Sequence, residues 1–451
     1  MRWTAEFVAR ALGLPPAAVR TDFAQISTDT RTLMAGALFV ALPGERFDGH
    51  DHLAEARDRG ATAAVVRRNT PAVPGLDLLA VDDTLRAYGD LARARRREIA
   101  GPVIAVTGTN GKTSTKEMLA AVLATRFRVH ATRANLNNLV GVPLTILEAP
   151  ADVEALVVEA GANLPGEIGR YRAVIEPSIT VITNVGAGHL EGFGSLDGVM
   201  EEKLALLREV PLAVVGTEPP ELAGRARHLA RRVVVAGLSQ GDVTPQSVEI
   251  EADGRARVRV DGSEFQLPYP GRHLAANAML AWAVARELGL EPAAVAAALG
   301  RFRLPGGRSE LLEQGSLTIL NDCYNANPQS FASAIATARA MRAGRRLVFV
   351  AGTMRELGPA AERLHAEVAA DLVALDPELL AAVGEFVPAL APYAGRLGDR
   401  LIAAADPAAL GPELARRLHG GELVVLKASR GVALERILPF LVVSPTSAPE
   451  V

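Results

Sequence analysis

The chain has 451 residues, of which 49% are hydrophobic and 22% are charged. This is the composition of an ordinary globular protein, and it excludes collagen-like, mucin-like and fully disordered classes. The 48 lysines and arginines nearly balance the 51 aspartates and glutamates, so the net charge is -3 and no overall positive field exists to hold a nucleic acid. At about 150 residues per domain, the length suggests roughly three domains, with two larger ones as the alternative.

Three features of the sequence bear on location. The longest apolar runs, residues 278–285 and 293–300, are much shorter than the about 18 residues that a membrane helix requires, so we expect no membrane span. The first ten residues carry Glu6 and Arg10 where a signal peptide has a continuous apolar core. A single cysteine, Cys323, excludes an intrachain disulfide. We therefore expect a cytoplasmic protein, and a monomer, that binds no nucleic acid.

In chain order, short β-branched runs alternate with longer amphipathic segments. Residues 38–40 and 63–66 predict strands of a small α/β domain, and a long charged helix is expected over residues 83–99. Residues 103–106 then read as a buried strand and residues 112–126 as an amphipathic helix. Further strands are expected at residues 155–158, 179–182, 212–215, 347–350 and 423–426. This order predicts an α/β fold with mainly parallel sheets.

The hydrophobic pattern changes in the second half of the central region. Residues 248–267 alternate strictly, with Asp261-Gly262 as a hairpin turn, which predicts an antiparallel edge on the central domain. The turn cluster Pro305-Gly306-Gly307 predicts a boundary before a third, Rossmann-like α/β block. We expect the tail, residues 444–451, to lack fixed structure. The predicted domains are residues 1–84, 85–305 and 306–451.

A glycine-rich loop lies between the strand at residues 103–106 and the following helix. Residues 107–113 read TGTNGKT, a compact variant of the phosphate loop. Backbone N–H groups and the helix N-terminus would face the phosphates, Lys112 would reach the terminal ones, and the Thr113 hydroxyl would bind magnesium. This context favours a nucleoside triphosphate, first of all ATP, over a simple turn with a surface lysine. The expected nucleotide-binding residues here are Gly108, Thr109, Asn110, Gly111, Lys112, Thr113 and Ser114.

This shortened loop resembles that of the Mur ligase family, whose ATP loop reads TG[ST]xGK[ST]. Further motifs follow in the order of that family: an asparagine-rich loop at residues 135–145, an acidic motif at 159–163, and the stretch 183–195. This last stretch, joined to residues 322–328 (DCYNANP), is similar to the branch that adds D-alanyl-D-alanine to UDP-N-acetylmuramoyl-tripeptide. The resemblance covers residues 25–437, nearly the whole chain.

The resemblance implies an N-terminal UDP-sugar domain, a central ATP-binding domain, and a C-terminal α/β domain that closes on ATP and the incoming dipeptide. It implies an ATP-dependent amide ligase that uses Mg²⁺ and acts on the small molecules UDP-N-acetylmuramoyl-tripeptide and D-Ala-D-Ala. In such a reaction, transfer of the γ-phosphoryl group makes an acyl phosphate, and the amine then attacks it. The product would be the UDP-muramoyl-pentapeptide precursor of peptidoglycan.

The resemblance also assigns catalytic and metal-binding roles. Glu159 and His189, each just after a predicted strand, become magnesium-site residues together with Thr113. Lys203 matches a lysine that carries a carbamate and would coordinate a second magnesium. Lys112 would carry much of the phosphate charge. From spacing alone, Glu159 is as readily a solvated acid, His189 a structural histidine and Lys203 a surface lysine.

The resemblance also implies residues around ATP and around the UDP-linked substrate. Asn277 matches a family asparagine near the adenine, and Arg308 matches an arginine that reaches the nucleotide, with a boundary salt bridge as its alternative. Asn325 and Asn327 resemble nucleotide-facing residues, with a tight polar turn as their alternative. The residues expected to bind the UDP-linked substrate are Ser27, Thr30, Arg31, Phe47, Asp48, Gly49, His50, Asn137 and Asn138. For the N-terminal ones, a capped turn and an ordinary loop without a binding role are the alternative.

The chain departs from the family pattern at a few positions. Thr353 stands where the family has aspartate, Gly188 where it has alanine, Ala205 where it has glutamate, and Leu274 where it has asparagine. Three rival functions remain: another amide ligase of this fold, tripeptide-forming or folylpolyglutamate-forming; a phosphate-loop ATPase that switches a partner; and a non-catalytic binder of UDP-muramyl peptides. Retention of Lys112, Thr113, Glu159 and His189 argues against the last.

Overall fold

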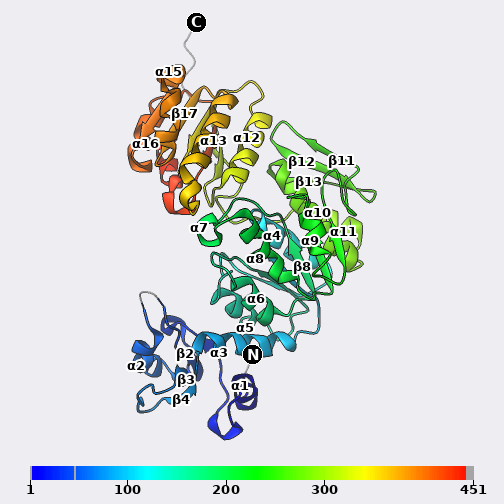
Figure 1. The fold of residues 1–451 in the computed structure, drawn as a ribbon, viewed down its shortest axis with the longest axis vertical. Helices are drawn as coiled ribbons and strands as arrows, with labels where there is room; N and C mark the ends of the chain where they lie inside the picture. The colour runs from blue at the N-terminus through cyan, green and yellow to red at the C-terminus, as the bar shows by residue number, and fades with distance from the viewer. Residues whose placement is uncertain (1–2, 45–46, 443–451) are drawn as a thin grey trace. The chain divides into compact units, whose positions relative to one another are not determined.

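The computed structural model describes residues 3–44 and 47–442 (Figure 1). The tail at residues 444–451, predicted to lack fixed structure, lies outside the described residues. By its internal contacts the chain divides into two compact units. The first unit comprises residues 1–105, 127–162 and 166–179, and the second comprises residues 106–126, 163–165 and 180–451. The predicted division into three domains stays a prediction.

The first unit begins with a small parallel sheet. Its strand order is β1 (Ile26–Ser27), β2 (Ala37–Val40), β3 (Ala61–Arg67) and β4 (Asp77–Val81), and neighbouring strands are parallel. Phe39 and Ala64 of this sheet pack with Leu53 and Ala56 of α2 (Leu53–Asp58) in a buried apolar cluster. The strands predicted at residues 38–40 and 63–66 are therefore confirmed.

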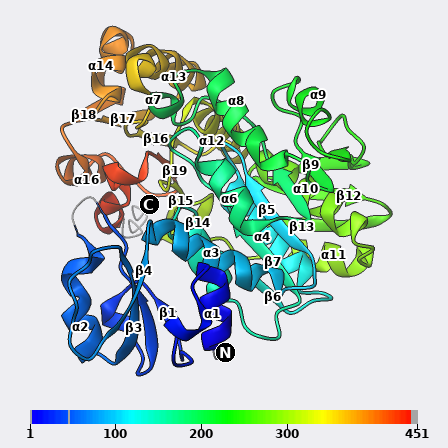
Figure 2. The same ribbon diagram turned by 60° about the horizontal axis from the view of Figure 1, so that its bottom comes forward.

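The long charged helix predicted over residues 83–99 is α3 (Thr84–Arg97). It begins at Asp83, whose carboxylate accepts the backbone N–H groups of Leu85 and Arg86, the usual way to satisfy a helix N-terminus. Figure 2 shows α1 (Ala5–Leu12) beside it, and the two helices pack together. α3 also packs against α5 and α6, which are Gly141–Leu147 and Glu167–Ile175.

Two buried strands, β5 (Val103–Thr107) and β8 (Ile179–Ile182), start in the first unit and end in the second. In the first unit, the Ser178 N–H donates to the Val103 carbonyl at 2.9 Å; in the second, the Thr183 N–H donates to the Thr107 carbonyl at 3.0 Å. The parallel pairs β6 (Val129–Ala131) with β7 (Ala155–Glu159), in the first unit, and β9 (Leu212–Val215) with β10 (Val233–Val235), in the second, complete this α/β region. The strands β5 and β8 are fully buried and rich in β-branched residues, which is typical of parallel sheets.

Helices of the second unit surround the end of β5. α4 (Lys112–Leu123), which stops short of the predicted Arg126, packs against α10 (Arg272–Glu287) and α11 (Pro292–Leu299). The apolar run at residues 278–285 lies within α10 and is buried there. Among the helices in the described part of the chain, none is long and apolar enough to cross a membrane. The shorter helices of this region are α7 (Leu190–Phe193), α8 (Leu196–Leu204) and α9 (Leu222–Ala226).

The alternating segment forms three antiparallel strands, but not as an edge of the central sheet. β11 (Ser247–Ile250), β12 (Arg255–Val260) and β13 (Ser263–Pro270) make a three-stranded sheet of their own, with Asp261-Gly262 at the predicted turn. One face is buried against α10: the Phe265 and Trp282 rings stack 5.9 Å apart, and Trp282 Nε1 donates to Asp261 at 2.8 Å. A helix therefore covers the apolar face of this separate sheet, and the predicted antiparallel strands are confirmed.

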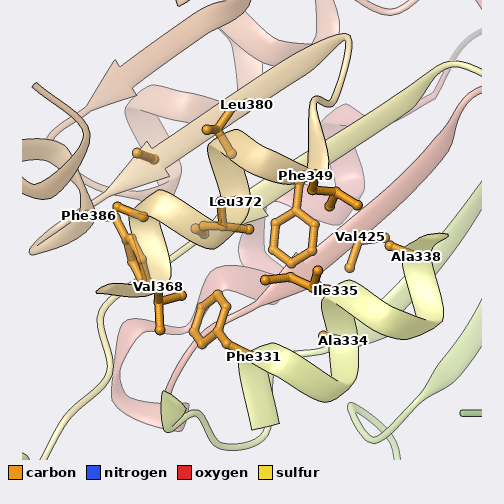
Figure 3. Close-up of a cluster of buried hydrophobic side chains, with 14 of the residues drawn as sticks. Phe331, Ala334, Ile335, Ala338, Phe349, Val368, Leu372, Leu380, Phe386 and Val425 are labelled. Atoms are coloured by element: carbon orange, nitrogen blue, oxygen red, sulfur yellow. The ribbon is translucent and has the colours of Figure 1, made fainter. Parts of the chain in front are cut away.

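The C-terminal part of the second unit is a doubly covered sheet. Helices α12 (Pro328–Met341), α13 (Ala361–Leu375) and α14 (Phe386–Leu390) share one apolar core, while α16 (Pro407–Ala415) belongs to a second one. Figure 3 shows Phe331 of α12 between Phe349 and Phe386, whose ring centroids lie 6.3 and 5.0 Å from it. Burial of each such ring contributes about 2–3 kcal/mol. The strand order is β14 (Glu310–Gln314), β15 (Leu317–Asp322), β19 (Leu423–Lys427), β16 (Leu347–Ala351), β17 (Leu379–Val383) and β18 (Leu401–Ala404), with only β14 antiparallel to its neighbour.

Candidate active site

The phosphate loop connects β5 to α4 with a backbone that requires glycine. Gly108 has φ 142° and Gly111 has φ 78°, conformations that other residues rarely adopt. A Cβ at Gly111 would lie 2.6 Å from the Asn277 side chain, so the amide predicted to lie near the adenine packs directly on this loop. Gly111 is the N-cap of α4, and no side chain among the described residues caps it. An uncapped helix N-terminus is a ready-made site for an anion.

The cationic side chain of the loop lies over its own backbone. Lys112 Nζ donates to the carbonyls of Gly108 at 2.8 Å and Thr109 at 3.0 Å. Thr113 and Ser114, in the first turn of α4, are buried. The structure therefore brings together the lysine, the helix N-terminus and the two hydroxyl residues predicted to bind nucleotide phosphates.

The end of β8 holds the phosphate loop from the other side. The Thr109 N–H donates to the Asn184 carbonyl at 2.9 Å, and the Asn110 N–H donates to Asn184 Oδ1 at 3.0 Å. Thr183 Oγ1 donates to the Asn110 carbonyl at 2.5 Å. Sequence reasoning missed Thr183 and Asn184 as supports of the loop, although they open the distinctive stretch at residues 183–195.

His189 lies within this stretch and faces an acid from the C-terminal part of the second unit. Its Nδ1 lies 2.6 Å from Glu356 Oε2, and both residues have a left-handed backbone, with φ 56° and 65°. The hydrogen bond from His189 lowers the pKa of Glu356, and the charges of Lys112 and Arg355 act in the same direction, against burial. Backbone strain of this kind is characteristic of functional sites. Glu356 was not among the predicted site residues, although it lies three residues after Thr353, a position compared with the family pattern.

Two departures from the family pattern have a structural explanation. A Cβ at Gly188 would lie 2.8 Å from Thr109 Cγ2, so glycine fits here because the loop carries threonine rather than serine. Thr353 Oγ1 accepts the Glu385 N–H at 3.0 Å, a hydrogen bond that a carboxylate could equally accept. Neither change removes a group from the phosphate loop.

The residues predicted to face the nucleotide from the C-terminal part form a second cluster. The Arg308 guanidinium stacks 3.8 Å above the Tyr324 ring, and the Arg430 guanidinium lies 5.9 Å from the same ring. Asn325 is exposed and its Oδ1 accepts the Ala326 N–H at 2.9 Å. The Asn325 carbonyl accepts Lys427 Nζ at 2.6 Å. Arg308 and Asn325 thus lie at one loop, whereas Asn277 lies at the phosphate loop.

In the first unit, Glu159 ends β7 and is buried. Asn137 Nδ2 donates to Glu159 Oε1 at 2.9 Å, and the Glu159 N–H donates to Thr132 Oγ1 at 3.0 Å. Asn138 instead accepts the backbone N–H groups of Val140 and Gly141, so it supports the turn before α5. The asparagine-rich loop therefore holds the acidic residue in one orientation.

Apart from Asn137 and Asn138 of the asparagine-rich loop, the residues predicted for the UDP-linked substrate form two turns in the first unit. Asp29 bonds Arg31, and this bond lowers the pKa of Asp29 despite the opposing effect of burial; Ser27 Oγ accepts the Asp29 N–H at 3.1 Å and Thr30 begins a 3-10 turn. In the second turn, Asp48 contacts His50 and Arg67, each at 2.6 Å.

Two more of the predicted residues, Phe47 and Gly49, lie in that second turn. A Cβ at Gly49 would lie 2.8 Å from the Leu42 nitrogen, so only glycine fits there, and the Phe47 side chain is 75% exposed. Glu45 and Arg46, the other residues of this turn, lie outside the described residues. An exposed aromatic ring beside polar turns is suited to stack on a base.

The predicted magnesium ligands differ in the chemistry of their side chains. Within residues 3–44 and 47–442, no three His, Cys, Asp or Glu side chains are grouped to hold a metal ion. Thr113 supplies a hydroxyl oxygen and Glu159 a fixed carboxylate, which suit Mg²⁺. Lys203 on α8 is 1% exposed, with its ammonium 5.6 Å from the Phe193 ring, and an unmodified ammonium is no ligand. Each of these two oxygen donors is by itself of the kind that Mg²⁺ prefers, while Lys203 would become a ligand only after modification.

Family comparisons cover the chain from its N-terminal sheet to its C-terminal one. The Mur ligase family catalytic domain matches residues 22–96, the Mur ligase middle domain matches residues 106–285, and the Mur ligase glutamate ligase domain matches residues 307–430. The second range contains the phosphate loop, Glu159, His189 and Lys203, and the third contains Arg308 and the loop before α12. The three parts of a Mur ligase thus occur in order in one chain.

Individual relatives show which branch of the family this chain resembles. The UDP-N-acetylmuramoyl-tripeptide–D-alanyl-D-alanine ligase of Bacillus subtilis is 35% identical over 443 residues, covering 94% of both chains. A crystal structure of MurF from Acinetobacter baumannii is 30% identical, with a TM-score of 0.88 over 98% of this chain and 99% of that one. MurF from Thermotoga maritima in complex with ADP is 28% identical, with a TM-score of 0.81 over 92% and 96%. The chain therefore belongs to the Mur ligase family, in its UDP-N-acetylmuramoyl-tripeptide–D-alanyl-D-alanine ligase branch, and is an ATP-dependent ligase that forms a peptide bond.

Proposed function

We propose that this enzyme joins D-alanyl-D-alanine to UDP-N-acetylmuramoyl-tripeptide, with conversion of ATP to ADP and phosphate. The observation that carries the proposal is the uncapped N-terminus of α4 with Lys112 beside it, close to the pair of His189 and Glu356. The names of the relatives support the two substrates. The product is the UDP-muramoyl-pentapeptide used in peptidoglycan synthesis.

The reaction needs ATP because a carboxylate is a poor electrophile and its oxygen a poor leaving group. Phosphoryl transfer from ATP to the peptide carboxylate forms an acyl phosphate, and attack by the dipeptide amine then expels phosphate. The protein contributes positioning and charge stabilisation. Lys112 would supply positive charge at the transferring phosphoryl group, and the N–H groups of α4 would bind the neighbouring phosphate oxygens.

Magnesium would neutralise phosphate charge when it is bound with ATP. The Thr113 hydroxyl and the Glu159 carboxylate, held by Asn137, are the oxygen donors we assign to it. His189 belongs to the same set in our proposal, with its Nδ1 turned toward Glu356. A carbamate on the buried Lys203 would add two further oxygen donors.

We assign the remaining residues by the groups they offer. Asn277 and Arg308 would bind the adenosine part and the phosphates, and Asn325 would lie beside them. In the N-terminal turns, Ser27, Thr30, Arg31, Asp48, Gly49 and His50 would bind the UDP part, with Phe47 stacked on its base. ATP and UDP-linked substrates place the reaction in the cytoplasm, and we expect a monomeric enzyme.

The test is phosphate release from ATP and Mg²⁺ in the presence of UDP-N-acetylmuramoyl-tripeptide, with and without D-Ala-D-Ala, with the product mass recorded alongside. We expect a product heavier by the dipeptide only when both substrates are present. L-glutamate and single amino acids serve as control acceptors, because a tripeptide-forming or glutamate-adding ligase would use them. Phosphate release that ignores every acceptor would overturn the proposal in favour of an ATPase.

A further inference from the structure

The tip of the phosphate loop is bonded to the start of α12, which lies 217 residues further along the chain. Asn327 Nδ2 donates to Asn110 Oδ1 at 2.8 Å, and Asn110 Nδ2 donates to Asn327 Oδ1 at 3.3 Å and to Gln329 Oε1 at 3.0 Å. We call these three side chains, Asn110, Asn327 and Gln329, the amide bridge. All its members lie in the second unit.

Asn327 has little freedom to leave this contact. It is the N-cap of α12: its Oδ1 accepts the Ser330 N–H at 2.9 Å, and its own N–H donates to Ser330 Oγ at 3.0 Å. Pro328 fixes the first helical position. Any shift of Asn327 away from the loop would therefore also break a capping box.

The loop that precedes Asn327 is anchored to β19. Lys427 Nζ lies 2.7 Å from Asp322 Oδ2 and donates to the Asn325 carbonyl at 2.6 Å, and all of these groups lie at one end of the sheet. Ser429 Oγ donates to the Ala326 carbonyl at 3.4 Å. Lys427 and Ser429 thus fix the loop that carries Asn327.

Gln329 makes the third contact of the bridge and extends it. Its Nε2 donates to Glu218 Oε2 at 3.1 Å. Its Oε1 packs so closely on Gly186 that a Cβ at Gly186 would lie only 2.2 Å from it. The Gly186 N–H in turn donates to Thr109 Oγ1 at 2.9 Å. The start of α12 is therefore packed against both the phosphate loop and the segment that holds this loop.

We propose that Asn327 and Gln329 are positioning residues, which act through Asn110 to keep the phosphate loop in the shape that binds ATP. Both polar atoms of the Asn327 amide are engaged by Asn110 and Ser330, so it acts on the loop rather than on the nucleotide. The backbone of Asn110 is held by Asn184 and Thr183, and the bridge holds its side chain. The proposal rests on the proposed function, since it takes the ligand of the loop to be ATP.

The first arm of the test needs no nucleotide. Asn327→Ser keeps a good N-cap for α12 but is too short to reach Asn110, whereas Asn110→Ala removes the bridge and leaves α12 untouched. Hydrogen exchange of the full-length protein without ligand should rise about fivefold or more for amides of residues 107–113 in both variants. Ser333→Ala, one turn further along α12, is the matched control. Exchange in the two variants equal to that of the control would overturn the bridge.

The second arm measures kinetics. Both variants should raise the KM for ATP about tenfold, with kcat within about threefold of wild type and an unchanged melting temperature. The double variant should be no worse than Asn110→Ala alone within a factor of two, because the two changes remove the same contact. Losses that multiply would overturn the proposal. Faster exchange in the variants together with a wild-type protein that binds no ATP would overturn the proposed function, and the assigned purpose of the bridge with it.

Discussion

Two loops of the second unit each follow the carboxyl end of a parallel strand and open a helix, yet they end in opposite ways. The loop before α12 closes with Asn327, whose side chain caps the helix in a capping box. The loop before α4 closes with Gly111 in a left-handed conformation, and no described side chain caps that helix. One helix N-terminus is satisfied by the protein, and the other is left for a ligand.

The comparison teaches what distinguishes a binding loop from a supporting one. In both loops, backbone carbonyls accept hydrogen bonds from a lysine. Lys112 donates to the carbonyls of Gly108 and Thr109 in its own loop. Lys427, at the end of β19, donates to the carbonyls of Asp322 and Asn325 in the loop before α12. Lys427 is buried with a carboxylate partner, 2.7 Å away at Asp322. Lys112 is only half-buried, at the uncapped helix end. We therefore expect Lys112 to matter for chemistry and Lys427 for stability.

The largest expected effect follows from removing the first lysine. Lys112→Ala should lower the rate of product formation by about a thousandfold or more, because the positive charge at the transferring phosphoryl group is lost. Its urea unfolding and its binding of UDP-N-acetylmuramoyl-tripeptide should remain close to those of wild type. A variant that retains a tenth of the wild-type rate would contradict the role assigned to Lys112.

The second lysine should show the reverse pattern. Lys427→Met leaves the Asp322 carboxylate, which is 22% exposed, without its cationic partner. The change should lower the free energy of unfolding by about 2–4 kcal/mol, measured by urea unfolding. Burial raises the pKa of Asp322, but Lys427 and smaller contributions outweigh it, so the pKa lies below its usual value. The stability from this pair is therefore present above the ordinary carboxyl pKa and is lost as the pH falls below it. Full stability in the variant at pH 7 would contradict this account.

A smaller change in stability is expected where Gly188 packs against Thr109 of the phosphate loop. Gly188→Ala should lower the free energy of unfolding by about 1–3 kcal/mol, since its new methyl group would meet Thr109 Cγ2. The added substitution Thr109→Ser removes that methyl and should recover most of the loss. Thermal unfolding of the single and double variants decides, and a double variant no more stable than Gly188→Ala would show that the explanation is wrong.

The smallest expected change in stability concerns the first unit and lies outside the comparison of the two loops. There, Glu176 forms ion pairs with two arginines. Hydrogen bonds from Arg97 and Arg93 lower the pKa of Glu176 to about 2, against the effect of burial. After allowance for solvent around the two arginines, Glu176→Gln should cost about 1–2 kcal/mol at pH 7. The difference from wild type should shrink as the pH falls from about 4.5 to about 2, because the pKa of the folded state is the lower one. Acid titration of stability, with Glu413→Gln as the exposed control, measures it.

Local patterns predicted much of the fold. The strands β8 and β9 have the predicted bounds, and the phosphate loop lies between strand and helix as its glycines and apolar runs indicated. The three strands β11 to β13 were found by their alternation, but alternation shows that one face is buried and not which element covers it. Strand β17 (Leu379–Val383), an apolar run rich in alanine, was missed because alanine is common in helices.

The site was predicted where one segment carries the chemistry and missed where two distant segments meet. Lys112 and Gly111 were predicted because both belong to the short motif at residues 107–113. The contacts of His189 with Glu356 and of Asn110 with Asn327 join residues more than 160 positions apart, as their numbers show. Only the folded chain reveals such pairs, because their geometry depends on how β15, β16 and α12 are placed within the second unit.

The central claim is that the uncapped end of α4 binds the nucleotide and the capped end of α12 supports it. A crystal structure of the wild-type protein with ADP and Mg²⁺ tests this claim most directly. We predict the phosphates at the N–H groups of residues 111–113, with Lys112 Nζ on a phosphate oxygen and the bond between Asn110 and Asn327 intact. Phosphates bound away from this helix end, or an Asn327 side chain that leaves Asn110 to bind the nucleotide, would contradict it.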